Sequence, residues 1–352
     1  MQPGAPAPRR GPGTRGGTWY HCAMAGWERV AVSDDIEPAA RRWHRRRIVL
    51  LALYVTAFVV TTALWGFPAS RDRVLIWVVT GLVVAVVGRP NALSRLCIDF
   101  LPVIVFLYAY DLLRGAADGV FGAVNNIPQL RVDEWLGVGT APTVRLQQLL
   151  WTPGHPHVWD YAAFLVYLTY FIVPITVAAV LWRRAPYLFH RYVSLWIGLS
   201  FAALVTYALY PASPPWLASS HGLLPHVSRI TPYMANHIGV DLSRVMGSQQ
   251  YVNKVAAVPS LHAATALLIT LFFWPRTTRW RWLLVVYPLA MALSLVYLGE
   301  HYVSDVLLGW LYAVVVFVVG NRVYDWFVAR SAARRRAEPV PPARREVEER
   351  SR

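Results

Sequence analysis

Charged residues are scarce in this chain: they make up 15% of its 352 residues, whereas hydrophobic residues make up 56%. A soluble domain usually carries about 25% charged residues. Several apolar runs also approach the roughly 20 residues that a helix needs to cross a bilayer. The composition therefore excludes a water-soluble enzyme and predicts an integral membrane protein.

Cysteine is nearly absent, since Cys22 and Cys97 are the only two thiols. They cannot form a disulfide-rich scaffold or a zinc site made of cysteines. Several histidines in polar segments also lack the spacing of a metal-ligand set. These are His155, His157, His221, His226 and His237. We therefore expect neither a metal nor a cofactor.

Positive charge is abundant, with a formal net charge of +15 and Lys254 as the only lysine among the basic residues. In a soluble chain, this excess would indicate a nucleic-acid partner. In a membrane protein, basic residues beside the spans set the orientation instead. We therefore expect a bilayer around this protein and no nucleic acid bound to it.

Apolar stretches predict an all-α, polytopic helical bundle with about eight membrane spans. The stretches cover residues 48–66, 73–88, 97–113, 158–182, 192–210, 258–275, 282–298 and 303–321. The second and third are short, which allows one of them to be tilted or re-entrant.

Basic residues fall on alternate connections between these stretches. They are Arg41 to Arg47, Arg89, Arg95, Arg183, Arg184, Arg191, Arg276, Arg279, Arg281, Arg330 and Arg334 to Arg336. The positive-inside rule makes their side cytoplasmic. We therefore expect a multi-pass plasma-membrane protein with both termini in the cytoplasm and two long outer loops, at about 114–157 and 211–257.

Three polar motifs gather at the outer ends of the spans. Residues 210–216 end the fifth stretch, residues 258–262 open the sixth, and residues 299–305 join the seventh to the eighth. Ionisable residues at the membrane are functional candidates by default. The shared depth of the motifs predicts one functional site at the outer leaflet.

The third motif contains His301 and Asp305, four residues apart. This spacing places both on one face of a starting helix. The carboxylate can then hold one imidazole nitrogen protonated and leave the other free as a nucleophile. For the pair alone, a hydrogen bond at the interface without catalysis is the alternative.

The second motif reads Pro259-Ser260-Leu261-His262. Proline suits the first turn of a helix, where free N–H groups and the Ser260 hydroxyl would bind an anion. His262 lies further in and could protonate a leaving alkoxide. Alone, the motif also fits a plain helix start, and its combination with His301 and Asp305 makes the chemical interpretation more specific.

Together these residues resemble the two C-terminal signatures of the type 2 phosphatidic acid phosphatase superfamily, integral membrane enzymes that act on lipid phosphates without a metal. Within it, the chain is most similar to the inositol phosphorylceramide synthase branch. Three features carry this likeness: Leu261, the Tyr-Pro-x-x-Pro-Pro-Trp segment at 210–216, and the pattern Asp133-x-x-Leu136-Gly137. The likeness covers roughly residues 97–320.

The resemblance implies a six-helix catalytic core and a reaction through a phosphohistidine. His301 would be the nucleophile, Asp305 would orient it, and His262 would protonate the leaving oxygen. The substrate would be a lipid phosphate, and the acceptor an alcohol or water. Tyr210, Pro215 and Trp216 are the residues that we expect to line the cleft. The sequence does not set the oligomeric state.

The chain departs from the lipid phosphatases where they bind phosphate. Leu295 replaces the arginine that these enzymes carry six residues before the nucleophile, and their upstream Lys-(six residues)-Arg-Pro signature is missing. Arg89-Pro90 does not replace it, because it lies on the cytoplasmic side. Fixed cations and N–H donors must therefore come from elsewhere.

Several residues on the outer side could supply these donors. For each cation, the alternative is a side chain that reaches the lipid head groups. The candidates are Ser260, Arg114 and Lys254, with Arg244 as a further cation.

The sequence thus predicts a lipid phosphotransferase that moves an inositol-phosphate-like head group between lipids at the outer leaflet. A phosphatase acting on a lipid phosphate or a polyprenyl (pyro)phosphate is the alternative, because the same site chemistry serves both. Two non-enzyme functions are further alternatives. A transporter would place charges near the bilayer midplane, where these spans carry almost none. The intact motif residues argue against an inactive scaffold.

We expect four regions along the chain. Residues 1–47 form a disordered basic tail, residues 48–96 accessory transmembrane helices, residues 97–321 the catalytic transmembrane domain, and residues 322–352 a disordered charged tail. Such polar, Arg-rich ends bury too little apolar surface to fold alone. Either Met1 or Met24 serves as the start.

Overall fold

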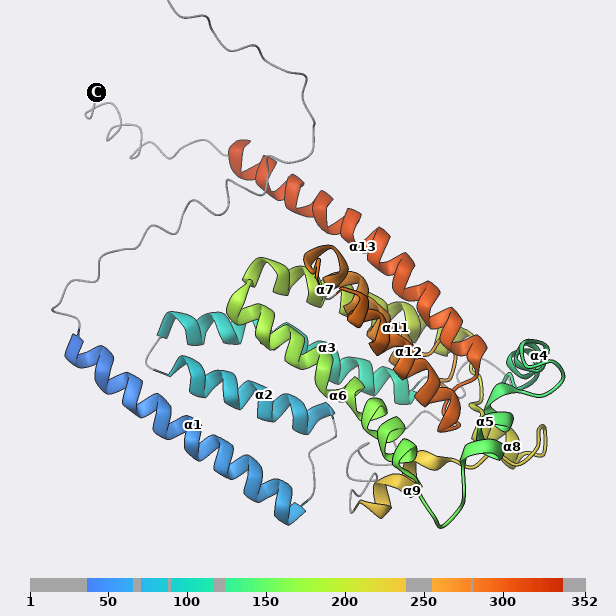
Figure 1. Cartoon of the computed structure of the whole chain (residues 1–352). Helices are drawn as coiled ribbons and strands as arrows, with labels where there is room; N and C mark the ends of the chain where they lie inside the picture. The colour runs from blue at the N-terminus through green and yellow to red at the C-terminus, as the bar shows by residue number, and fades with distance from the viewer. Residues whose placement is uncertain are drawn as a thin grey trace, which may run out of the picture. The chain divides into compact units, whose positions relative to one another are not determined.

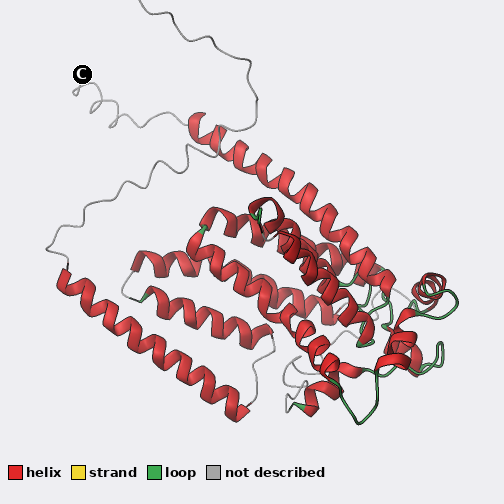
Figure 2. Ribbon diagram, in the orientation of Figure 1, coloured by secondary structure: helices red, strands yellow, loops and turns green. Residues whose placement is uncertain are grey.

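The computed structural model describes residues 37–65, 71–87, 90–116, 124–238, 255–279 and 281–337. Helices dominate these ranges, and extended backbone occurs there only as isolated bridges (Figure 2). The all-α prediction is therefore confirmed. The chain divides into two units, Met1–Ile48 and Val49–Arg352. In the first unit, the described residues form the start of a helix. The motifs that predict the functional site lie in the second unit.

The helices are labelled in chain order. They are α1 (Glu37–Trp65), α2 (Arg71–Val86), α3 (Pro90–Ala116), α4 (Ile127–Leu136), α5 (Pro142–Leu150), α6 (Val158–Arg184), α7 (Pro186–Leu209), α8 (Pro215–Ser220), α9 (Ile230–His237), α11 (Leu261–Phe273), the 3-10 turn η3 (Trp274–Arg276), α12 (Arg281–Tyr297) and α13 (Val303–Ala337).

Within the described ranges, five helices are long and apolar enough to cross a membrane. Their spans are Arg46–Leu64, Asn91–Tyr110, Val158–Arg184, Pro186–Leu209 and Val303–Arg334. Shorter apolar helices occupy Leu75–Val86 and Arg281–Tyr297, and α11 has 13 residues. A helix thus occupies each predicted stretch. The chain is a multi-pass membrane protein, and the count of eight spans stays a prediction.

Helices extend into both of the tails that the sequence predicts to be disordered. Helix α1 already begins at Glu37, and α13 continues to Ala337. Arginine is a good helix former, so the basic residues beside a span can extend its helix beyond the apolar stretch. Residues 1–36 and 338–352, the rest of these tails, lie outside the described residues.

Apolar side chains cover the outside of the bundle. On α12, for example, Leu283, Val286, Leu289 and Leu293 are all exposed at helical spacing. Soluble monomers rarely expose contiguous apolar patches of this kind. Such a row fits a helix face that lies against lipid.

Helix α11 lies among α6, α7, α12 and α13, all of which it contacts. It carries small buried residues, including Ala263, Ala264 and Ala266, which let neighbouring backbones approach closely. Gly309 of α13 does the same, because a Cβ there would lie 2.4 Å from the Ser260 carbonyl oxygen. The start of α11 therefore packs directly against α13.

Helices α7 and α13 are antiparallel and are tied together near both ends of α7. Near its start, Arg191 donates hydrogen bonds to Asn321 (2.6 Å) and Asp325 (2.7 Å). Near its end, the hydroxyls of Thr206 and Tyr312 lie 2.6 Å apart. The first residues of α13 therefore lie beside the end of α7.

The short helices of the two long loops gather at this same end of the bundle (Figure 1). Helix α4 contacts α13, α5 contacts α12, and α9 contacts α6. A small second core, which includes Leu130, Val144, Ala218 and Tyr302, joins α4, α5 and α8 to the residues before α13. The long loops thus cover the segment that carries His301.

Candidate active site

A tight turn between α12 and α13 carries His301. Gly299 has a φ of 79°, which glycine adopts without strain. A Cβ there would also lie 2.9 Å from the Ser228 carbonyl oxygen. The N–H groups of Glu300 and His301 both donate to the Leu295 carbonyl, at 3.1 and 3.3 Å. These bonds bring the chain back over the end of α12 and fix where His301 lies.

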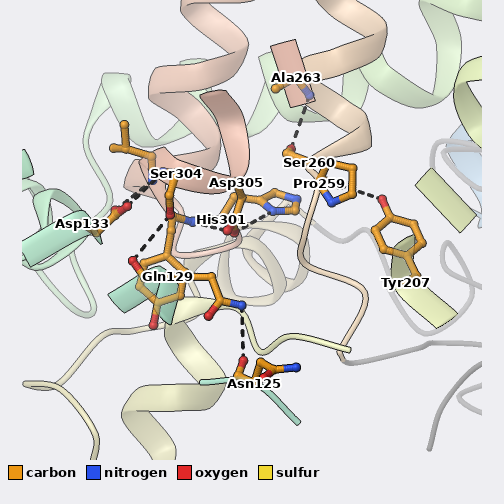
Figure 3. Close-up of polar contacts among 12 residues, drawn as sticks. Asn125, Gln129, Asp133, Tyr207, Pro259, Ser260, Ala263, His301, Ser304 and Asp305 are labelled. Atoms are coloured by element: carbon orange, nitrogen blue, oxygen red, sulfur yellow. Dashed lines mark hydrogen bonds and ion pairs between the residues drawn. The ribbon is translucent and has the colours of Figure 1, made fainter. Parts of the chain in front are cut away.

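His301 and Asp305 lie side by side, as their spacing predicts (Figure 3). Nδ1 of His301 is 3.4 Å from Oδ2 of Asp305, which also accepts the Tyr302 N–H at 2.9 Å. Both side chains are buried, with Asp305 at 0% exposure and His301 at 6%. The Asp305 carboxylate thus lies beside Nδ1 of the His301 ring.

Asp133 of α4 caps the helix that begins beside His301. Its carboxylate accepts the N–H groups of Val303 (2.8 Å) and Ser304 (2.9 Å), the first two residues of α13 (Figure 3). Asp133 is fully buried. Burial raises the pKa of its carboxyl group, and the two backbone N–H bonds oppose that rise. The sequence marked Asp133 only as a family pattern, and the structure gives it a physical role.

Ser260 is the N-cap of α11. Its hydroxyl oxygen accepts the Ala263 N–H at 3.4 Å, and its own N–H donates to the Asp305 carbonyl at 3.0 Å. The helix begins at Leu261. Pro259 therefore precedes the cap, whereas the sequence predicts it in the first turn of the helix. The Pro259 carbonyl instead accepts the Tyr207 hydroxyl at 2.8 Å.

His262 lies among aromatic rings of α6 and faces the other histidine. Its ring stacks on Tyr167 with centroids 5.0 Å apart, and it is tilted against Tyr170 at 3.9 Å. Its centroid is 5.9 Å from that of His301. Two histidines from separate motifs therefore meet at one place.

The residues expected to line the cleft lie next to this pair. The backbone N–H of Trp216 donates to the Gly299 carbonyl at 3.4 Å. Pro215 is buried and is the first residue of α8. Burial and the charge of Asp305 raise the pKa of Tyr210. Tyr210 and Trp216 thus lie close to the catalytic candidates.

The predicted cations are not among the described side chains. Lys254 and Arg244 lie outside the described residues, and so does the side chain of Arg114. Within the described ranges, no three His, Cys, Asp or Glu residues group as metal ligands would. The absence of a metal stays a prediction.

Sequence reasoning missed Arg229, which the structure places at the turn. Its Nε and Nη2 donate to the two carboxylate oxygens of Glu300 at 3.0 and 3.2 Å. Its guanidinium lies over the Trp216 ring, 4.4 Å from the centroid. Burial lowers the pKa of Arg229, but the charge and hydrogen bonds of Glu300 raise it more. Glu300, directly before His301, was the available signal in the sequence.

Comparisons with known proteins find similarity over much of the chain. The family model of the PAP2 superfamily matches residues 129–319. A phosphoinositol dihydroceramide synthase of Bacteroides thetaiotaomicron is 26% identical over 276 residues, covering 74% of this chain and 86% of the relative. No solved structure matches significantly.

Two fungal proteins match over shorter ranges. The inositol phosphorylceramide synthase catalytic subunit of Schizosaccharomyces pombe is 28% identical over 130 residues, 35% of this chain and 30% of the relative. The inositol phosphorylceramide synthase of Candida albicans is 27% identical over 168 residues, 46% of this chain and 36% of the relative. The matches span about a third of each fungal protein, and together the relatives confirm the resemblance to this branch.

Proposed function

The chain belongs to the PAP2 superfamily, and we propose that it transfers a phospho-head group between lipids through a phosphohistidine at the outer leaflet. Its family and its relatives identify it as a membrane enzyme of the lipid phosphotransferase or phosphatase kind. One observation carries the finer proposal: the rings of His262 and His301 lie 5.9 Å apart, with Asp305 beside Nδ1 of His301.

In the first step, Nε2 of His301 attacks the phosphorus of the donor lipid. The N–P bond forms as the P–O bond to the lipid alcohol breaks, and His262 gives its proton to that leaving oxygen. Asp305 keeps Nδ1 protonated and stabilises the positive charge that develops on the ring. The 3.4 Å contact between the two side chains supports this role.

In the second step, an acceptor hydroxyl attacks the phosphohistidine. His262, now neutral, takes the hydroxyl proton while the N–P bond breaks and its electron pair returns to His301. A lipid alcohol gives transfer, whereas water gives hydrolysis. The short helices over the turn support transfer, because closing a site excludes water from a reactive intermediate.

The names of the relatives guide the substrate proposal. Two of them are inositol phosphorylceramide synthases, and the third is a phosphoinositol dihydroceramide synthase. We assign this chain an inositol-phosphate-like head group and a lipid alcohol as the acceptor. Hydrolysis of a lipid phosphate is the second candidate, because its first step is the same.

Domain limits and topology are part of the proposal. The family match at 129–319 supports a catalytic domain at 97–321, with 48–96 as accessory helices. Both termini would be cytoplasmic in the plasma membrane, and the reaction would need no metal. The Arg-rich connections opposite the site support this orientation.

The test uses purified protein in detergent, with EDTA present throughout. Phosphorus-labelled donors, phosphatidylinositol and polyprenyl phosphate, are incubated with and without diacylglycerol, ceramide or free inositol. We expect label in a lipid that contains the acceptor, and none with His301→Ala. Release only as water-soluble phosphate, whatever the acceptor, would identify a phosphatase. Full activity of His301→Ala would exclude the proposed mechanism, and loss of activity in EDTA would exclude metal independence.

A further inference from the structure

We infer that Arg229 binds the phosphate group of the lipid substrate, in place of the basic residues that this chain lacks. The inference rests on the proposed function and names the cation of that site. It is carried by the position of the guanidinium next to the turn that bears His301.

The backbone around Arg229 is fastened to that turn. The Ile230 N–H donates to the Leu298 carbonyl at 3.2 Å. Gln147 of α5 accepts the Ser228 N–H at 2.8 Å and donates to both the Ser228 and the Tyr297 carbonyls at 2.9 Å. Residue 229 therefore keeps its register beside residues 297–301.

The side chain of Arg229 is held on two sides. Glu300 takes the N–H groups of Nε and Nη2, and the Trp216 ring covers one face of the guanidinium. Arginine has five N–H donors in a rigid fork. The two bonds to Glu300 therefore leave other donors, and the side chain is 28% exposed. A guanidinium held in this way can present its other edge to a phosphate with little loss of conformational freedom.

Two paths connect the guanidinium to the reacting histidines. Glu300, which binds it, directly precedes His301 in the chain. On the other side, the guanidinium lies over the Trp216 ring, and the Trp216 backbone N–H donates to the Gly299 carbonyl at 3.4 Å. Arg229 therefore lies beside the turn that carries His301, whose ring centroid is 5.9 Å from that of His262.

The site needs such a donor for an electrostatic reason. Negative charge on the phosphoryl oxygens must be stabilised by fixed cations and N–H groups in the transition state. Position 295, where lipid phosphatases carry arginine, is a leucine with 0% exposure, packed in the core of this protein. Arg229, in the 211–257 loop, thus supplies the positive charge that lipid phosphatases place at the position of Leu295.

The first test measures binding without turnover. Inorganic phosphate is titrated into detergent-solubilised His301→Ala protein, and binding is followed by calorimetry and by thermal stabilisation. When Arg229→Gln is combined with His301→Ala, phosphate binding should weaken by about tenfold or more. Arg229→Lys in the same background should weaken it by less, because lysine keeps the charge but loses the forked guanidinium. Arg131→Gln, an exposed residue of α4, is the matched control and should leave binding unchanged.

The second test separates phosphate binding from a purely structural ion pair. Glu300→Gln removes the partner but keeps the cation, so phosphate should bind at least as tightly. In turnover, Arg229→Gln should lower kcat/KM by about 100-fold and Glu300→Gln by clearly less. Equal losses in both variants, with phosphate binding intact in Arg229→Gln, would overturn the inference.

Folding and the premise are controlled separately. If Arg229→Gln aggregates on gel filtration, the test rests on Arg229→Lys and Glu300→Gln. Unchanged phosphate affinity in Arg229→Lys together with weaker phosphate binding in Glu300→Gln would overturn the inference. Failure of the proposed function appears elsewhere, as full turnover by His301→Ala with wild-type Arg229.

Discussion

At the scale of single residues, the buried carboxylate of Asp305 should control the reactivity of His301. Asp305→Asn keeps the size of the side chain but removes the charge that holds Nδ1 protonated. A similar loss in a histidine–aspartate pair costs about 10,000-fold in kcat. We therefore expect kcat to fall by about 1,000-fold or more in the lipid transfer assay. A loss below tenfold, in protein that elutes as wild type does, would contradict this role.

His262 should matter most for poor leaving groups. It lies across from His301, where it can give a proton to the departing oxygen. His262→Ala should slow transfer from a natural lipid donor by about 100-fold or more, but barely slow the initial burst of p-nitrophenol from an activated phosphodiester, whose leaving group needs no proton in the first step. Parallel kinetics with both donors measure this difference. Equal losses with both would exclude a general-acid role.

The sequence predicted the pairs that short spacings determine. His301 and Asp305 lie side by side four residues apart, although α13 begins only at Val303, and the motif around Ser260 starts a helix. Arg229 escaped prediction because its position depends on long-range bonds, from Gln147 to Ser228 and from Ile230 to Leu298. No local pattern encodes those contacts, so the acidic Glu300 directly before His301 was the one sign in the sequence that a basic partner lies nearby.

At the scale of elements, the start of α13 depends on its cap. Asp133→Ala would leave the N–H groups of Val303 and Ser304 without their partners in a buried place. We expect a loss of about 2 kcal/mol in unfolding free energy and a fall in kcat, because the helix start also sets the position of Asp305. Thermal unfolding in detergent and transfer kinetics measure both. Glu134→Ala, at a half-buried position on α4, is the matched control.

The stability of the wild type relative to Asp133→Asn should depend on pH. Burial raises the pKa of Asp133 above 3.8, so the folded state holds this proton more tightly than the unfolded state does. Such a group contributes most below its unfolded pKa and loses that contribution as pH rises through the folded pKa. As pH rises from 3.8 through the raised pKa of the folded state, the wild type should therefore lose stability relative to the variant. A constant difference in thermal midpoint would contradict this.

Element prediction succeeded for the bundle and failed at the end of the bundle that carries His301. Apolar stretches identify membrane helices because the backbone must satisfy its own hydrogen bonds in lipid. The short helices α4, α5, α8 and α9 lie in polar loops, where no such rule applies. Contacts such as the cap from Asp133 and the bonds of Gln147 hold them in place, and these are tertiary.

At the scale of the whole molecule, the site and the basic connections occupy opposite ends of the bundle. His301 precedes α13, whereas Arg191 binds Asp325 towards the other end of that helix. From the positive-inside rule, we expect the Arg191 end to be cytoplasmic. The site would then face outward, and a donor lipid and its acceptor would both have to lie in the outer leaflet.

Cysteine labelling in intact cells tests this orientation. Cys22 and Cys97 are first replaced by serine. His155 and Arg279 are both exposed, the first between α5 and α6 and the second between η3 and α12. An impermeant maleimide should label His155→Cys directly, but Arg279→Cys only after permeabilisation. The reverse pattern would place His301 at the cytoplasmic leaflet, and the phosphohistidine chemistry would then have to draw on lipids and acceptors of that leaflet instead.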